Sequence, residues 1–560
     1  MRLNGAKIIT ECLLEQGVDT VFGFPGGQII ETYDALYTYS DRIRHILTAH
    51  EQGAAHAADG YARASGRVGV VIATSGPGAT NLVTGLATAY MDSVPVVAIT
   101  GNVALQQLGR DSFQEVDIFG VTLPITKHNF IVRDVHTLAD ILRQAFRIAA
   151  SGRPGPVLVD VPRDVQQAEC DYQREPRREI APDADRITEE DLSRAKAMLE
   201  AAERPVIFAG GGVIRANASA ELRRFADRIN APVSMSLMGL GAYPASEKKC
   251  LGMLGMHGTK TSAKAVSEAD LLIVCGARFS DRAIMKPNAI AEQLRVLHLD
   301  IDDAEINKNI VSHASIRGDL RVILEKLNNR IDSGPRTGWM ARVEEIRTRE
   351  PHTTKKALTP QALIDTVRMN VPDDTIIATD VGQHQMWVAQ CYPFNHPRTL
   401  LTSGGLGTMG YGLGAAIGAQ FAEPGRRVIL FTGDGSFHMN MNELTTVSSN
   451  NLPIVIVIMN NGVLGMVRQW QKILYGQRYS QTTTGRTTNF VKLAEAFGIE
   501  GIRITEPAEL KAAVPLAIAN GRPAVIDVRI DKDECVYPMV APGQSFTDPI
   551  TSKEKQRSAK

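Results

Sequence analysis

Apolar runs of strand length alternate with segments of helical periodicity along most of the chain. Near the N-terminus this pattern predicts a helix over 4–16, which the chain enters at once and which ends at Gly17. It also predicts strands over 20–24, 43–48, 68–73 and 95–100, and a helix that runs through Tyr90. Alternation of this kind is typical of a parallel α/β sheet covered by helices.

A similar pattern returns far along the chain. Residues 68–101 read as a strand, a Gly-Pro-Gly turn, a helix, the connection Asp-Ser-Val-Pro and a second strand. Residues 427–461 read as a strand, a Gly-Asp-Gly turn, a helix over 436–450, the connection Asn-Leu-Pro and a strand over 452–459. The repetition suggests two related α/β domains. The alternative is that any two α/β units look alike at this level.

A third α/β unit lies between these two. It has predicted strands over 205–209 and 271–275, with Gly210-Gly211-Gly212 directly after the first. Charged stretches that contain proline, 166–190 and 332–360, are candidate linkers. We therefore expect three doubly wound parallel-sheet domains, at 1–170, 190–335 and 360–545, followed by a polar, basic tail over 551–560 that frays.

Composition narrows the function classes. The 560 residues are 44% hydrophobic and 22% charged, with zero formal net charge, so no basic surplus calls for nucleic acid or an anionic membrane. The apolar runs are too short to span a bilayer, and the first residues read as neither a signal nor a transit peptide. The six cysteines are scattered and read as small buried hydrophobes. A reduced cytoplasm is the expected location.

The most informative polar residues follow the two strands of the second repeat. Asp434 and Asn461 each stand just past the end of an apolar strand, and such ends meet at the ligand-binding edge of a parallel sheet. One carboxylate and one amide oxygen suit Mg²⁺, which takes further oxygens from water and phosphates. The glycines beside Asp434 would let a diphosphate approach the backbone. The plainer interpretation is an aspartate that caps a helix.

Glu51 adds a second signal, because it follows a predicted strand and opens a helical segment over 51–63. Alone, a carboxylate at a helix N-terminus is explained by the helix dipole. Together with Gly433-Asp434-Gly435 and Asn460-Asn461, it resembles the thiamine-diphosphate decarboxylase and carboligase superfamily. The resemblance implies that Glu51 contacts the aminopyrimidine ring as an acid–base group. It also implies that Asp434, Asn461 and the backbone carbonyl of Val463 ligate Mg²⁺.

Further motifs narrow the resemblance. The segment 404–412 looks like the one that wraps the cofactor, with the Gly407 carbonyl on the aminopyrimidine amine and Met409 supporting the bent cofactor. Met409 could equally be plain core. Other diphosphate or cofactor contacts implied by the resemblance are Val381, Gly382, Gln383, His384, Gly435, Ser436 and Met466.

The segment Gly465-Met466-Val467-Arg468-Gln469-Trp470 is the most specific. It is similar to the acetohydroxyacid synthase (acetolactate synthase) family, the large catalytic subunit of the flavin-containing, biosynthetic type, and the resemblance covers nearly the whole chain. It implies that Phe113, Gln114, Met466 and Trp470 line the substrate pocket and that Arg282 guides the carboxylate of the second keto acid. An isolated Trp is more often a core residue.

The same resemblance places FAD, without net redox chemistry, on the middle unit. The residues implied are Arg153, Gly210, Gly211, Gly212, Ser236, Leu237, Met238, Met256, His257, Gly276, Ala277, Arg278, Asp300, Ile301 and Asp319. By themselves, the three glycines after a strand would indicate only a generic dinucleotide turn. Five positions depart from the family pattern and bear on inhibitor sensitivity and fine affinity rather than on reaction type: Gln28, Ala104, Arg163, Ser280 and Val463.

The implied reaction decarboxylates pyruvate and joins the two-carbon unit to pyruvate or 2-ketobutyrate, giving 2-acetolactate or 2-aceto-2-hydroxybutyrate for branched-chain amino-acid synthesis. Glu51 and Asp434 lie in different domains but would grip opposite ends of one cofactor. The family does this across a subunit interface, so the resemblance implies a homodimer or homotetramer. The sequence leaves open whether a small regulatory subunit binds. The competing interpretations are a pyruvate oxidase and a non-catalytic thiamine-diphosphate-binding scaffold. Glyoxylate carboligase, which lacks the activating glutamate, is disfavoured by Glu51.

Overall fold

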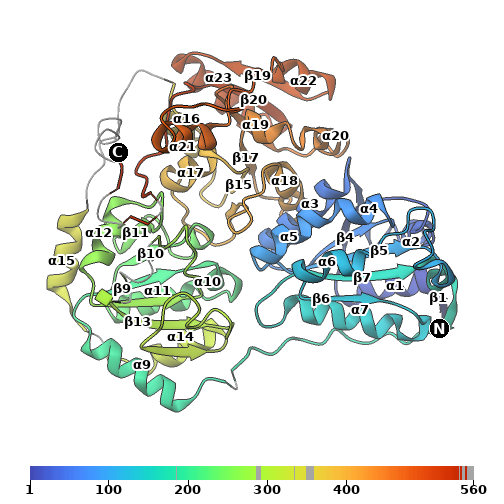
Figure 1. Ribbon diagram of the computed structural model, residues 1–560, viewed down its shortest axis with the longest axis horizontal. Coiled ribbons are helices and arrows are strands. Elements are labelled where there is room, and N and C mark those ends of the chain that lie inside the picture. Colours follow the sequence, from blue (N-terminus) through green and yellow to red (C-terminus); the bar gives the residue numbers. More distant parts are fainter. Residues whose placement is uncertain are drawn as a thin grey trace.

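Three α/β domains, each built on a six-stranded parallel sheet, make up the computed structural model (Figure 1). The structure describes residues 1–184, 186–285, 290, 292–332, 334–347, 358–541, 543–544 and 549–551. This architecture confirms the predicted fold class. In the described part of the chain, no helix combines the length and apolar composition needed to cross a membrane.

The N-terminal domain has the strand order β3-β2-β4-β5-β7-β6. Its strands are β2 (Thr20–Phe24), β3 (Arg44–Leu47), β4 (Gly69–Ala73), β5 (Val96–Asn102), β6 (His128–Ile131) and β7 (Val157–Pro162). Its helices are α1 (Gly5–Glu15), α2 (Ile30–Thr38), α3 (Glu51–Ser65), α4 (Pro77–Asn81), α5 (Val83–Met91), α6 (Ile118–Thr122), α7 (Val135–Ala150) and α8 (Arg163–Gln167). The four predicted strands are present within two residues of their expected ends.

Two expectations for this domain are wrong. The chain does not enter a helix at once, because β1 (Arg2–Asn4) pairs antiparallel with β8 (Glu169–Asp171) before α1 begins. A three-residue strand paired with a distant segment leaves no periodicity to detect. The helix predicted through Tyr90 is two helices, α4 and α5, which meet near Leu82.

The central domain has the strand order β11-β10-β9-β12-β13-β14. Its strands are β9 (Pro205–Ala209), β10 (Val233–Met235), β11 (Cys250–Met253), β12 (Leu271–Cys275), β13 (Arg295–Asp300) and β14 (Ala314–Arg317). In chain order this is 3-2-1-4-5-6, the doubly wound order that binds ligands where the winding reverses. That point lies between β9 and β12, beside Gly210 and Gly276.

Helices cover this sheet: α9 (Glu189–Ala201), α10 (Gly211–Arg215), α11 (Ser219–Arg228), α12 (Lys260–Glu268), α14 (Leu320–Asn328) and α15 (Thr337–Ile346). Helix α15 corrects the linker predicted over 332–360. Its Trp339 is buried and donates a hydrogen bond from Nε1 to the Pro205 carbonyl at 3.0 Å, so this part of the stretch belongs to the domain. Residues 348–357 of that stretch lie outside the described residues.

The C-terminal domain has the strand order β16-β15-β17-β18-β20-β19. Its strands are β15 (Ile376–Thr379), β16 (Leu400–Leu401), β17 (Val428–Gly433), β18 (Val455–Asn460), β19 (Glu500–Ile504) and β20 (Ala524–Arg529). Its helices are α16 (Pro360–Met369), α17 (Gln383–Cys391), α18 (Tyr411–Ala422), α19 (Asp434–Phe437), α20 (Leu444–Ser449), α21 (Gly465–Leu474), α22 (Phe490–Ala496) and α23 (Pro507–Ala519). The helix predicted over 436–450 is broken by a 3₁₀ turn, η4 (Met441–Glu443).

The first and last domains share one topology. Numbered within each domain, both sheets have the order 2-1-3-4-6-5. The repeated sequence segments fall on equivalent strands, β4 and β5 in one domain and β17 and β18 in the other. The structure therefore supports the prediction of two related α/β domains.

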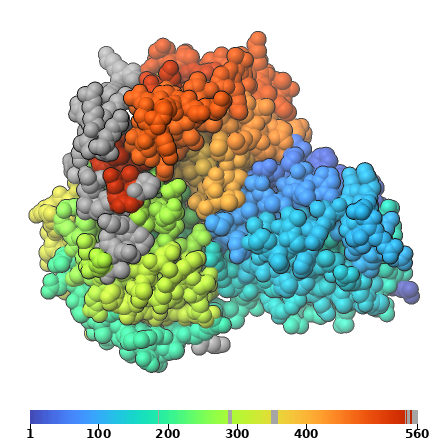
Figure 2. Space-filling view, viewed as in Figure 1, coloured from blue at the N-terminus to red at the C-terminus, as the bar shows by residue number. Residues whose placement is uncertain are grey.

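The same two domains pack closely through helices α3 and α18 (Figure 1). Small residues permit the approach: a Cβ on Gly418 would lie 1.8 Å from the Ala57 carbonyl oxygen, and one on Gly60 would lie 2.2 Å from that of Ala415. The C-terminal domain, orange to red, also lies against the central domain, in green (Figure 2). Residues of all three domains can therefore meet beside α18.

Candidate active site

Asp434 and Asn461 leave the same edge of the C-terminal sheet. Strands β17 and β18 pair in parallel with Gly433 opposite Met459, so the next residues, Asp434 and Asn460, emerge side by side and Asn461 follows. Asp434 is 4% exposed, and burial raises the pKa of its carboxyl. The Val463 N–H donates to Asn461 Oδ1 at 3.2 Å, which orients the amide oxygen.

The carboxylate of Asp434 would be the main charge offered to a cation here. Among the described residues there is no group of three or more His, Cys, Asp or Glu side chains placed to hold a metal. Of the described C-terminal-domain residues that line the cavity beside this edge, Asp434 is the only one with a carboxylate. A single carboxylate suits a hard cation that completes its shell with phosphate and water oxygens.

A large cavity opens from this edge into the central domain. Its volume is about 2310 Å³. A pocket for one small ligand usually measures roughly 300–1,000 Å³, so this space can hold two ligands. Its lining includes these predicted residues of the C-terminal domain: Val381, Gly382, Gln383, His384, Gly407, Met409, Asp434, Gly435, Ser436, Asn461, Val463, Met466 and Trp470. From the other domains it includes Arg153, Gly211, Gly212, Ser236, Leu237, Met238, Met256, His257, Gly276, Ala277, Arg278, Arg282, Asp300, Ile301 and Asp319.

His384 is an orphaned polar group at the C-terminal end of the cavity. Burial lowers the pKa of its imidazole to about 3, so the ring is neutral at pH 7. Its Nε2 is buried and has no hydrogen-bond partner among the described residues. A Cβ on Gly433 would stand 2.9 Å from the Nδ1 of this ring, so glycine leaves the room it occupies. A buried ring nitrogen without a partner fits a polar ligand atom entering the cavity.

At the central-domain end of the cavity, two turns of the backbone pack closely against each other. A Cβ on Gly212 would lie 2.7 Å from the Gly276 Cα, which brings the turn after β9 against the turn after β12. Gly210 lies behind this wall, outside the lining described above, and its N–H donates to the Cys275 carbonyl at 2.9 Å. Burial raises the pKa of Asp300 to about 6 and lowers that of His257 to about 4. Exposed backbone at the point where the winding of such a sheet reverses is the usual binding site of a dinucleotide.

Not all of the predicted cofactor-contact side chains are free in this structure. Arg153 is ion-paired to Asp302 at 3.1 Å and to Glu305 at 2.9 Å. Asp319 Oδ1 accepts the N–H groups of Arg321 and Val322 and so caps α14. A ligand at this end would share these side chains with contacts they already make.

Arg282 and Trp470 come together across two domains. The Arg282 guanidinium carbon lies 5.6 Å from the centroid of the Trp470 ring, within cation–π range. Arg282 comes from the loop after β12, and Trp470 from α21, next to Met466. A cationic donor and a rigid apolar face therefore share one wall of the cavity.

Besides Gly210, three predicted site residues lie outside the lining of this cavity: Glu51, Phe113 and Gln114. Glu51 begins α3 and is 8% exposed, and its Oε2 accepts a hydrogen bond from Asn81 Nδ2 at 2.9 Å. The Gln114 backbone adjoins Gly76, and the Phe113 ring is 84% exposed. One chain thus presents two separate half-sites.

Sequence reasoning missed Asp92, which also lines the cavity. It accepts hydrogen bonds from the N–H groups of Gly404 and Gly405, at the start of the segment that carries Gly407 and Met409. The only signal was its place in the connection Asp-Ser-Val-Pro that the internal repeat singled out.

Three family models decide the family, because each matches one of the three domains and they match in the same order along the chain. Residues 3–121 match the thiamine pyrophosphate enzyme N-terminal TPP-binding domain, 192–327 match its central domain, and 380–528 match its C-terminal TPP-binding domain. The chain is 46% identical over 552 residues to acetolactate synthase isozyme 1 large subunit of Escherichia coli, covering 98% of each chain. The chain belongs to the acetolactate synthase large-subunit branch of the thiamine pyrophosphate enzyme family.

Other relatives agree across distant organisms. The chain is 46% identical to acetolactate synthase isozyme 2 large subunit of Escherichia coli, over 98% of this chain and 99% of the relative. It is 45% identical to a probable acetolactate synthase large subunit of Methanocaldococcus jannaschii, over 98% and 95%. Membership of the thiamine pyrophosphate enzymes identifies thiamine diphosphate as the cofactor and confirms that the chain is an enzyme of this class.

Proposed function

We propose that this protein is the catalytic subunit of an acetolactate synthase. It decarboxylates pyruvate and condenses the two-carbon unit with pyruvate or 2-ketobutyrate, in the first common step of branched-chain amino-acid synthesis. The near-full-length identity to relatives with this name carries the proposal. The pairing of Arg282 with Trp470 on the cavity wall supports it, because a keto acid needs a cation for its carboxylate and an apolar face for its alkyl group.

The cavity would hold two cofactors and a cation. The diphosphate of thiamine diphosphate would lie against His384 and Ser436, with Mg²⁺ on Asp434, Asn461 and the Val463 carbonyl. FAD would occupy the central-domain end, along Gly211, Gly212 and Gly276. The orphaned Nε2 of His384, the buried carboxylate of Asp434 and the glycine-lined turn fit these groups. When bound, thiamine diphosphate supplies a nucleophilic carbon and an electron sink for decarboxylation.

The chain's own residues bind, orient and exchange protons. Glu51 holds a proton at its carboxyl group and passes it to and from the aminopyrimidine end of the cofactor. Arg282 donates charge-assisted hydrogen bonds to the carboxylate of the second keto acid. Trp470, Met466 and Phe113 provide the apolar surface for its alkyl group, and Gln114 adds a polar contact. These roles are part of the proposal.

The active site would be completed by a second copy of the chain. Glu51, Phe113 and Gln114 lie apart from the cavity of their own chain, and a homodimer, alone or within a tetramer, would bring them to the cavity of the partner. We also propose a cytoplasmic enzyme that pairs with a small regulatory subunit, because the relatives are called large subunits.

The test is an anaerobic assay of the purified protein with pyruvate, thiamine diphosphate, Mg²⁺ and FAD. Two pyruvate molecules should give one acetolactate and one CO₂ without any electron acceptor. Turnover that requires an electron acceptor and yields acetate or acetyl phosphate would instead indicate a pyruvate oxidase. Cofactor binding without turnover would indicate a binding scaffold.

A further inference from the structure

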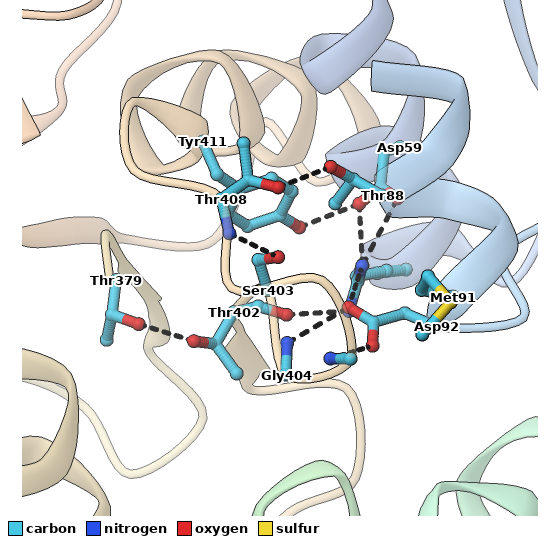
Figure 3. A network of polar contacts seen from close by, with 12 residues as sticks. Asp59, Thr88, Met91, Asp92, Thr379, Thr402, Ser403, Gly404, Thr408 and Tyr411 are labelled. Atoms are coloured by element: carbon cyan, nitrogen blue, oxygen red, sulfur yellow. Dashed lines mark hydrogen bonds and ion pairs between the residues drawn. The ribbon is translucent and has the colours of Figure 1, made fainter. Parts of the chain in front are cut away.

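A buried charge network joins the N-terminal and C-terminal domains (Figure 3). Arg63 of α3 donates from Nε to Asp59 Oδ1 at 2.6 Å and from Nη2 to Asp92 Oδ2 at 2.9 Å. Its Nη1 donates to the Thr402 carbonyl of the C-terminal domain at 2.8 Å. All three charged side chains are at most 5% exposed. Charges taken this far out of water are kept only when each is paired and hydrogen-bonded.

Asp92 fixes the start of the cofactor segment of the C-terminal domain. Its Oδ2 accepts the Gly404 N–H at 3.1 Å, and its Oδ1 accepts the Gly405 N–H at 2.7 Å. A Cβ on Gly405 would lie 2.9 Å from the same Oδ1, so the carboxylate touches the backbone itself. Further along, Thr408 Oγ1 pairs with Thr88 Oγ1 at 2.7 Å, as Figure 3 shows. The segment that carries Gly407 and Met409 is therefore held at both ends by α5 and the turn after it.

The central domain holds the same turn from the other side. Arg215, the last residue of α10, donates to the Asp92 carbonyl, and Arg278 donates to the Met91 carbonyl at 2.8 Å. Helix α10 begins at Gly211, in the turn assigned above to the flavin. Arg215 and Asp92 both line the large cavity. Asp92 is thus the residue at which backbone and side-chain contacts of all three domains meet.

Charged side chains of all three domains gather at this junction. Asp59 and Asp92 carry two negative charges. They face the positive charges of Arg63, of Arg215 and Arg278 from the central domain, and of Arg398 from the C-terminal domain, which donates to the Arg63 carbonyl at 3.2 Å. Moving α10 would leave a buried carboxylate with one compensating cation fewer, and that imbalance would be transmitted to the two glycine N–H groups it holds. Such a contact can make binding at one end of the cavity alter affinity at the other.

We propose that Asp92 is a positioning residue that couples the two ends of the cavity, so that FAD in the central domain tightens the binding of thiamine diphosphate in the C-terminal domain. Arg215 transmits the position of α10 to Asp92, and Asp92 sets the position of Gly404 and Gly405. Because linkage is reciprocal, thiamine diphosphate tightens FAD by the same factor. The inference rests on the cofactor placement proposed above.

The experiment measures four dissociation constants in the intact protein with excess Mg²⁺. Calorimetry gives the Kd of thiamine diphosphate with and without saturating FAD, and flavin fluorescence gives the Kd of FAD with and without thiamine diphosphate. In the wild type the ratio should be at least about fivefold in each direction, the lower end of ordinary allosteric coupling. The coupling is the ratio of the Kd values of one cofactor without and with the other. A variant that simply binds flavin more weakly therefore does not look like a variant that has lost the coupling.

Arg215→Gln removes the cation but leaves the ion pairs of Arg63 intact, and its coupling ratio should fall to within about twofold of one. Arg215→Lys keeps a cationic donor and should retain most of the coupling. Asp92→Asn should also lose it. If Asp92→Asn does not fold, the coupling ratios of the two Arg215 variants still test the proposal. Arg224→Gln, the same change on an exposed arginine of α11 paired with Glu221, is the matched control and should couple as the wild type does.

A wild-type ratio of one, or full coupling in Arg215→Gln, would overturn the proposal. These outcomes are independent of the proposed function, which the anaerobic assay tests. If the protein makes acetolactate and binds both cofactors without coupling, only the role proposed for Asp92 is contradicted, and the proposed function stands.

Discussion

The Glu443 carboxylate is hydrogen-bonded to the backbone at His50, directly before Glu51. Its Oε1 accepts the His50 N–H at 3.0 Å and its Oε2 accepts the Ala49 N–H at 3.1 Å. Glu443 is fully buried, and a Cβ on Gly53 would lie 2.1 Å from its Oε1. A side chain of the C-terminal domain therefore fixes the two residues that lead into α3, directly before the candidate proton-transfer group.

We expect Glu443→Gln to lower kcat by about 10- to 100-fold, because an amide offers one acceptor oxygen where two peptide N–H groups need one each. The Kd of thiamine diphosphate, held through Asp434 and His384 in the cavity, should change little. Steady-state kinetics and calorimetry on the same preparation measure both. Thr446→Val is the control, because it removes only the hydroxyl that donates to Glu443 Oε2. A wild-type kcat in Glu443→Gln would show that Glu51 does not need this support.

The preference for the second keto acid should depend on Trp470. Pyruvate and 2-ketobutyrate differ by one methylene, which an apolar contact can distinguish by about 1–3 kcal/mol. Trp470→Leu should keep acetolactate formation from pyruvate within a few-fold. Its preference for 2-ketobutyrate should drop by roughly tenfold, or about 1.4 kcal/mol.

The measurement is the ratio of the two products at several ratios of 2-ketobutyrate to pyruvate. Trp470→Phe keeps an aromatic face toward Arg282 and should give an intermediate ratio. An unchanged product ratio in Trp470→Leu would mean that Trp470 has only a packing role. Phe113 and Met466 would then be the next candidates for the specificity surface.

Much of this arrangement could be predicted from the sequence, and the reason is local patterning. Strands β2, β9 and β12 match their predicted ranges because buried parallel strands read as continuous apolar runs. Asp434 and Asn461 were found because each directly follows such a run. The strand order shared by the first and last sheets agrees with the internal repeat, because the repeat was recognised from the same apolar runs.

The residues that support the site could not be predicted in this way. Glu443 and Ala49 are 394 positions apart, and Asp92 and Gly404 are 312 apart. A carboxylate in a turn or a 3₁₀ helix matches many roles, and only the packing of α3 against α18 determines which peptide groups it meets. The separation of Glu51 from the cavity of its own chain is likewise a property of domain packing.

Asp160 should make stability depend on pH. Its carboxylate is buried in β7, where burial raises its pKa to about 7, and it accepts hydrogen bonds from Thr100 Oγ1 at 2.6 Å and Asn102 Nδ2 at 2.5 Å. In the unfolded chain an aspartate has a pKa of about 3.9. Between these values the folded protein keeps the proton that the unfolded chain loses, so this contribution is complete below about pH 4 and is lost as pH rises to about 7.

The slope from this one group is at most about 1.4 kcal/mol per pH unit. Asp160→Asn cannot ionise and should lack it, so the unfolding midpoint of the variant should fall less than that of the wild type between pH 5 and 7. Denaturant unfolding followed by far-UV circular dichroism at several pH values measures the difference. Parallel pH profiles for the two proteins would contradict the assignment.

The central claim is that Glu51 of one chain and the Asp434 cavity of another form one active site. Glu51→Gln alone should lose roughly 10²–10⁴ in rate, the usual value of a positioned acid–base group. Asp434→Ala alone should lose thiamine-diphosphate affinity, partly recovered with excess Mg²⁺. Each variant should fold, and each should be almost inactive by itself.

The most direct measurement mixes these two variants in equal amounts, lets the subunits exchange, and assays acetolactate. Half of the resulting dimers should be hybrids, and each hybrid would contain one site with both Glu51 and Asp434 intact. The account predicts recovery of about a quarter of the wild-type activity. Activity that stays at the level of the separate variants, in a mixture shown to contain hybrids, would contradict it.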